Sequence, residues 1–174
     1  MERYYLGLRA PSPLNEHIRA MQQELFDSAT TVEPLDPHLT LVPPPRLARL
    51  PSAEIAPHAR AAAAQFLPLE LRIEGTKVFQ EHVFVLSISG KGLQPLRDNL
   101  ETFIPAEASS PRWQPHPFSP HITISETIGG APLQADRLAA YERAFQPLIG
   151  WRFIVDNLTL YRWLGPRRYQ LEDL

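Results

Sequence analysis

The sequence feature that most constrains the fold is a pentapeptide that occurs twice. Its copies read Pro-His-Leu-Thr-Leu at residues 37–41 and Pro-His-Ile-Thr-Ile at residues 120–124. Successive side chains of a β-strand point to opposite faces, so each histidine shares a face with the threonine two residues later. The aliphatic residues then point toward a core. The chain thus places an imidazole beside a hydroxyl on two separate strands, which predicts a site built from both copies.

The elements around the two copies also repeat. Alternating apolar residues predict strands at 4–8, 38–41, 69–79, 83–88 and 121–124, a long final strand at 153–160 with a bulge near 156–157, and an edge strand at 169–171. Apolar residues at helical spacing predict helices at 14–27, 52–66, 93–103 and 138–148. The order of elements around the first copy matches the order around the second, which indicates an internal duplication.

The duplication predicts one bilobal domain over residues 1–174. We expect a first lobe unit at about 1–80 and a second at about 81–174. The expected fold class is α+β (α/β), with two pseudo-symmetric lobes around a central cleft, each lobe a mostly antiparallel sheet with helices on its outer face. Lobes related by a pseudo-twofold axis would put the two histidine strands on opposite sides of that cleft.

Composition excludes several classes of function. The chain has no cysteine, so it has no disulfide, thiolate metal site or cysteine nucleophile. A net charge of −2 argues against a protein that coats a long phosphate backbone, but it allows recognition of one terminal phosphate or a small nucleotide. Neither a secretory signal pattern nor a membrane-spanning apolar run is found in the sequence. We therefore expect a cytoplasmic monomer with no membrane partner.

The residue types in the repeated motif suit acid–base chemistry at phosphorus. Imidazole populates both protonation states near neutral pH, so His38 and His121 are the candidate catalytic acid and base. Attack and departure at phosphorus lie roughly in line, which requires the acid and the base on opposite sides of the phosphate. The hydroxyls of Thr40 and Thr123 can donate to nonbridging oxygens. This chemistry needs no metal and no cofactor.

Further candidates lie near the ends of the predicted strands. Arg9 and Arg162 are candidate phosphate ligands, although exposed surface arginines are an equally good interpretation. Phe79, Trp113 and Phe118 are candidates for stacking on a nucleobase, with ordinary packing as the alternative.

The two intact motifs resemble those of the two-histidine phosphoesterase superfamily, which is defined by a twice-repeated His-x-Thr/Ser-x sequence. The wider context is similar to its LigT-like branch, named RNA 2',3'-cyclic phosphodiesterase or 2'-5' RNA ligase, through the strand at 4–8, Phe-Ser-Pro at 118–120 and Leu-Thr-Leu-Tyr-Arg at 158–162. The resemblance implies hydrolysis of a 2',3'-cyclic phosphate on an RNA end or a small cyclic nucleotide. We expect His121 to be the base that activates water and His38 to be the acid.

Three alternatives stay open at this point. The chain could be a noncatalytic protein that binds an RNA end or a nucleotide. It could act as a 2'-5' RNA ligase by the reverse reaction. In a third, less favoured interpretation, the histidines would be ligands of a metal-dependent hydrolase.

Overall fold

A computed structural model describes residues 3–112, 114–165 and 168–174. Its strands are β1 (Tyr4–Arg9), β2 (His38–Val42), β3 (Leu69–Phe79), β4 (Val83–Ser89), β5 (His121–Glu126), β6 (Arg152–Val155), β7 (Thr159–Gly165) and β8 (Arg168–Asp173). Its α-helices are α1 (Leu14–Leu25), α2 (Ser52–Phe66), α3 (Leu93–Thr102) and α4 (Ala135–Phe145). Short 3-10 turns lie at η1 (Pro44–Arg46), η2 (Ala106–Ala108), η3 (Ile128–Gly130) and η4 (Gln146–Leu148).

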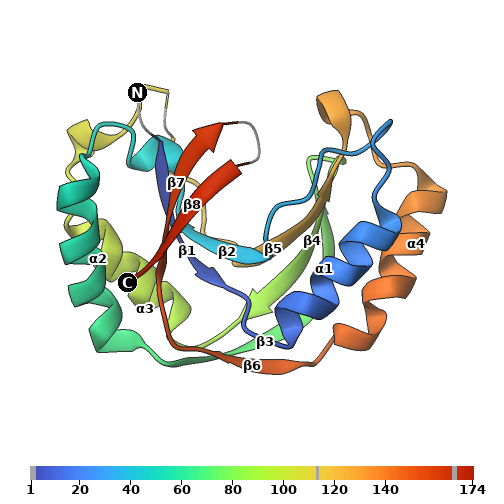
Figure 1. Cartoon of the computed structure of the whole chain (residues 1–174), viewed down its shortest axis with the longest axis horizontal. Coiled ribbons are helices and arrows are strands. Elements are labelled where there is room, and N and C mark those ends of the chain that lie inside the picture. The colour runs from blue at the N-terminus through green and yellow to red at the C-terminus, as the bar shows by residue number, and fades with distance from the viewer. Residues whose placement is uncertain (1–2, 113, 166–167) are drawn as a thin grey trace.

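The α+β class is confirmed, and all the strands belong to one sheet. The sheet has eight strands in the order β6-β3-β4-β5-β2-β1-β7-β8, and every described pairing is antiparallel. The two histidine strands, β2 and β5, are neighbours at its centre. From this junction the two halves of the sheet rise apart, so the molecule has the shape of a V (Figure 1).

The predicted helices and most predicted strands are confirmed, but the long final strand is wrong. The chain from 153 to 160 divides at Asp156–Asn157 into β6 and β7, which lie in opposite halves of the sheet. β6 pairs with β3, whereas β7 pairs with β1 and β8. β6 buries Phe153 and Val155, and the chain then buries Leu158 and Leu160. Apolar residues therefore recur on both sides of a change of partner that the sequence pattern does not reveal.

Helices cover the outer faces of the V. α2 and α3 pack together on one side and α1 and α4 on the other (Figure 1). α1 precedes β2 in the chain but contacts β5, and α3 precedes β5 but contacts β2. Each half of the structure therefore takes elements from both sides of residue 80, so the two halves are interleaved along the chain rather than consecutive.

Matching β-bulges show how far the internal symmetry extends. Between β1 and β2 the register passes from Leu6↔Val42 to Gly7↔Thr40, which leaves Leu41 as the extra residue. Between β4 and β5 it passes from Phe84↔Ser125 to Val85↔Thr123, which leaves Ile124 as the extra residue. Leu41 and Ile124 are the last residues of the two pentapeptides. The repeated pentapeptide therefore corresponds to a repeated β-bulge. Such bulges commonly change the direction of side chains next to active sites.

The main core lies between the sheet and the helices. It contains Leu6, Leu8, Leu39, Leu41, Phe84, Leu86, Ile122 and Ile124 from the central strands, together with apolar faces of the four helices. Within the described part of the chain, no helix is both long enough and apolar enough to cross a bilayer.

Candidate active site

The pairing of β2 with β5 brings the two motifs into one constellation. The strands meet through Leu39 and Ile122, whose side chains are buried in the core. When this antiparallel register is extended by one residue each way, His38 lies opposite Thr123 and Thr40 lies opposite His121. All four side chains point to the face of the sheet that is opposite the core. The histidines are diagonal neighbours, for which ordinary antiparallel geometry gives a backbone separation of about 7–8 Å.

Both imidazole rings are held in the same way. The Nδ1 atom of His38 lies 2.7 Å from the carbonyl oxygen of Asp36, and the Nδ1 atom of His121 lies 2.7 Å from the carbonyl oxygen of Ser119. A carbonyl can only accept a hydrogen bond, so Nδ1 carries the proton in both rings. The Nε2 atom of each neutral ring is then a proton acceptor, and after protonation it is a donor. In each copy, the carbonyl of the residue before the proline accepts from the histidine ring and so fixes its tautomer.

Each histidine also contacts an aromatic ring from an equivalent position. Tyr161 lies with its ring centroid 4.9 Å from that of His38, and Phe79 lies 4.9 Å from His121, edge to face. Tyr161 is the register partner of Tyr5 in β1, and Phe79 is the register partner of Val83 in β4. The internal symmetry therefore relates the two rings. Phe79, a candidate for nucleobase stacking, is packed against a catalytic candidate.

The environment of His38 is more enclosed. The ring of Tyr5 lies 5.1 Å from His38 and stacks on Tyr161 at 4.3 Å, and both tyrosines are buried. Burial lowers the pKa of His38, as does the nearby His121, whereas the hydrogen bond and charge of Asp36 act in the opposite direction. Burial also raises the pKa of Tyr5 and of Tyr161, so both phenols stay neutral. His38 therefore favours its neutral form near neutral pH.

A cleft of about 240 Å³ opens above the motif threonines, between the two halves of the sheet. His38, Thr40 and Thr123 line it from the central strands. One wall is formed by Tyr5, Pro44 and Tyr169, and the other by residues 124–126 and by the segment 32–35. Apolar and hydrogen-bonding side chains line the cleft together, as in sites for small polar ligands.

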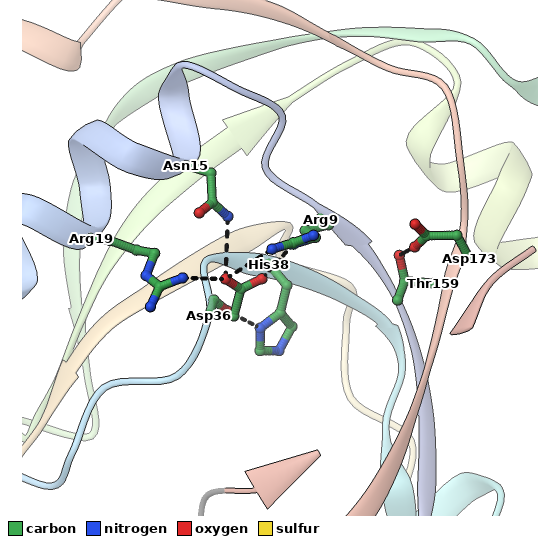
Figure 2. Close-up of polar contacts among 7 residues, drawn as sticks. All are labelled: Arg9, Asn15, Arg19, Asp36, His38, Thr159 and Asp173. Carbon is green, nitrogen blue, oxygen red and sulfur yellow. Dashed lines mark hydrogen bonds and ion pairs between the residues drawn. The ribbon is translucent and has the colours of Figure 1, made fainter. Parts of the chain in front are cut away.

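Arg9 and Arg162 occupy different surroundings. Arg9 donates from Nε to the Asp36 carboxylate at 2.7 Å, so its guanidinium is engaged beside the site (Figure 2). Arg162 is the register partner of Tyr4, a core residue, and lies on the opposite face of β7 from Tyr161. The structure therefore does not bring Arg162 to the face that carries the histidines.

Phe118, another of the aromatic candidates, does not line the cleft. Phe118 packs against the core, and the guanidinium carbon of Arg97 lies over its ring at 4.8 Å. Trp113 lies outside the described residues. Of the three stacking candidates, only Phe79 is described in contact with a motif residue.

Three residues of the site were missed from the sequence: Tyr5, Asp36 and Gln22. Tyr5 lies on the cleft face of a strand that was predicted, so alternation could have found it. Asp36 lies directly before the first pentapeptide, and the second copy has Ser119 there, so the repeat did not indicate it. Gln22 of α1 donates from Nε2 to the carbonyl of Ile124 at 3.1 Å and so supports the bulge of β5. No sequence pattern indicated that contact, because it joins residues far apart in the chain.

In residues 3–112, 114–165 and 168–174, no group of three or more histidine, aspartate or glutamate side chains is placed to hold a metal ion.

Comparisons with known proteins agree with this arrangement. The chain resembles three solved structures: TT0787 of Thermus thermophilus (23% identity, TM-score 0.70, 99% of this chain and 94% of that one), a phosphoesterase (20%, 0.68, 99% and 95%) and Escherichia coli LigT complexed with NADP+ (19%, 0.65, 99% and 95%). At these identities the likeness establishes the fold. No curated protein sequence matches the chain.

A family model gives the more specific result. The model described as the 2'-5' RNA ligase superfamily matches residues 10–167, which include both motifs. The resemblance to two-histidine phosphoesterases is thereby confirmed, and a phosphoesterase or ligase-type activity is supported. The chain belongs to the 2'-5' RNA ligase superfamily.

Proposed function

We propose that the protein is a metal-independent phosphodiesterase that hydrolyses a 2',3'-cyclic phosphate on an RNA end or a small cyclic nucleotide. The observation that carries this proposal is the antiparallel pairing of β2 with β5 at Leu39 and Ile122. Extended by one residue each way, that register puts each motif histidine opposite the threonine of the other motif. Escherichia coli LigT, of similar fold, has been solved with phosphate and with 3'-AMP, which favours a nucleotide as the substrate class.

The proposed reaction uses one histidine on each side of the phosphorus atom. The Nε2 atom of one ring takes a proton from water as the water oxygen forms a bond to phosphorus. The bond between phosphorus and O3' breaks, and the Nε2–H of the other ring gives its proton to O3'. The product is a 2'-phosphate with a free 3'-hydroxyl. Thr40 and Thr123 donate hydrogen bonds to the nonbridging oxygens, where negative charge increases.

We assign His38 as the base and His121 as the acid, the reverse of the expectation from sequence. Burial lowers the pKa of His38, so its ring is neutral and ready to accept a proton at neutral pH. The role of general acid then falls to His121, the other imidazole of the pair.

Because one chain supplies both histidines and both threonines, we expect a monomer to be active. An RNA terminus or a small nucleotide in the cytoplasm is the expected partner. Ligation by reversal of the same chemistry is the second candidate, which the family description favours.

The test is product analysis with purified protein, with and without chelator, on 2',3'-cyclic nucleotides and on RNA carrying that end. We expect a 2'-phosphate product, insensitivity to chelator, and a loss of about 10²–10⁴ in kcat for His38→Ala and for His121→Ala. His82→Ala is the matched control, because its Nδ1 also bonds the carbonyl two residues earlier but lies at the β3–β4 turn. Unchanged turnover in either motif variant would refute the acid–base pair. Binding without turnover would favour a noncatalytic role, and inactivation by chelator would favour metal catalysis.

A substrate with a different leaving group distinguishes the catalytic acid from the catalytic base. A nucleoside p-nitrophenyl phosphodiester releases a phenolate that needs no proton, so the variant that lacks the acid should regain activity on it. We expect this recovery for His121→Ala and not for His38→Ala. Recovery in His38→Ala alone would restore the assignment expected from sequence.

A further inference from the structure

The residue two positions before each motif histidine differs between the copies. It is Asp36 in the first and Ser119 in the second, and in both the main-chain carbonyl binds the histidine ring. The Asp36 carboxylate is surrounded by donors (Figure 2). Arg9 approaches it at 2.7 Å through Nε and at 3.5 Å through Nη2, Asn15 at 3.5 Å through Nδ2, and Arg19 at 3.6 Å through Nη1.

These contacts join three parts of the fold at one carboxylate. Arg9 is in β1 and is the register partner of His38, whereas Asn15 and Arg19 lie one turn apart on α1. Asp36 itself lies in the segment 32–37, which has no helix or strand of its own. Its side chain therefore ties an irregular segment to a strand and a helix, while its carbonyl holds the ring. A carboxylate in charge-assisted hydrogen bonds is a strong anchor for such a segment.

The second copy has no such anchor. Among the described residues, the Ser119 side chain makes no hydrogen bond or ion pair. The internal symmetry that relates the strands, the bulges and the aromatic rings is thus broken at this charged cluster. The carbonyl that binds His38 therefore belongs to a residue with an anchored side chain, whereas the carbonyl that binds His121 does not.

We infer that Asp36, held by Arg9, Asn15 and Arg19, is a positioning residue that fixes the ring of His38 so that its Nε2 atom faces the reacting phosphate. The inference rests on the proposed function, in which His38 transfers a proton. Asp36 acts through its own carbonyl and does not touch the substrate. Asp36 and His121 influence the pKa of His38 by their charges, and the rings of Tyr5 and Tyr161 pack against its ring.

The variants Asp36→Asn and Asp36→Ala test this role. Both keep the main-chain carbonyl, but they remove the charge that holds the segment and leave two arginines uncompensated near the ring. We expect kcat to fall by about 10- to 100-fold with KM within about twofold, because a small misplacement of a catalytic group affects the chemical step. Asp27→Asn is the matched control, because Asp27 also pairs with an arginine, Arg137 at 3.6 Å, but lies beyond the C-terminal end of α1.

Nuclear magnetic resonance of ¹⁵N-labelled histidine supplies a readout that does not depend on activity. In the wild-type protein we expect a fixed Nδ1–H tautomer for His38. In Asp36→Asn we expect mixed tautomers and a lower titration midpoint, because the carboxylate that favours the charged ring is gone. A wild-type tautomer, titration midpoint and kcat in Asp36→Asn would overturn the inference. If the wild-type protein hydrolyses no cyclic phosphate, the proposed function fails, and the tautomer and titration measurements still decide the role of Asp36.

Discussion

The substitution Gly7→Ala gives the sharpest test of how β1 positions the first motif. A Cβ atom on Gly7 would lie 2.7 Å from the carbonyl oxygen of Leu39 and 3.4 Å from the ring of Tyr161. Leu39 stands between His38 and Thr40, and a main-chain oxygen cannot turn aside as a flexible side chain can. β1 and β2 must therefore separate by a few tenths of an ångström within the motif.

Overpacking of this kind costs about 1–3 kcal/mol. For a chain of this length the cost corresponds to a fall in Tm of about 2–12 °C. Displacement of the motif should lower kcat as well, by about 10-fold, since misplacement of about 1 Å can cost about 100-fold. Thermal unfolding and turnover of a 2',3'-cyclic nucleotide measure the two effects.

Gly75→Ala is the matched control, because a Cβ atom on Gly75 meets nothing within 4 Å. That variant should keep both wild-type stability and wild-type activity. If Gly7→Ala unfolds at the wild-type temperature with wild-type kcat, the close approach of β1 to the motif does not constrain the site, and the reasoning is refuted.

Three further predictions concern the hydroxyls, the supporting contact of α1 and pH. Thr40→Val and Thr123→Val should each lower kcat about 10²–10³-fold with native circular dichroism, and wild-type kinetics in both would remove the threonines from the site. Gln22→Leu leaves a buried carbonyl without its donor and should cost about 1–3 kcal/mol in urea unfolding, whereas the exposed Gln23→Leu should be neutral; equal stabilities would contradict this. The acid limb of kcat/KM should have its midpoint below the ordinary histidine value of 6.5, since protonation of His38 removes the base. The unfolded chain then binds a proton that the folded chain does not, so the free energy of unfolding should fall as pH is lowered through that value, and His38→Ala should flatten this slope.

Local pattern was sufficient for most of the strands, the helices and the motif faces. Alternation placed His38, Thr40, His121 and Thr123 on one face each, and the pairing of Leu39 with Ile122 then joined the two faces. Both motifs alternate polar and apolar residues with the two-residue period of a β-strand, so the sequence alone was enough to predict which side chains share a face.

Long-range pairing was not accessible in the same way. In the segment 153–160, buried apolar residues recur on both sides of the point where the chain changes partners, and α1 packs on the half of the sheet that contains β5. The sequence duplication shows that two equivalent units exist, but it does not show that they exchange elements. The spacing of apolar residues indicates which face of a strand or helix is buried, but not which other element packs against that face.

Residues chosen by chemistry alone had mixed outcomes for a similar reason. Arg162 lies on the face of β7 opposite Tyr161, and Arg9 is engaged with a carboxylate that the sequence analysis did not consider. Charge type identifies a possible phosphate ligand, but strand face and nearby partners decide whether the guanidinium is available. Phe79 packs against His121, and its role in stacking on a nucleobase stays a prediction.

The most direct test of the account is a crystal structure of the protein bound to a nucleoside 2'-phosphate, the expected product. We predict that the phosphate lies between the Nε2 atoms of His38 and His121, one on each side of phosphorus, with the hydroxyls of Thr40 and Thr123 on its nonbridging oxygens. A phosphate bound away from the four motif residues, or held with both Nε2 atoms on one side of phosphorus, would contradict the central claim that the two motifs form one site for in-line displacement.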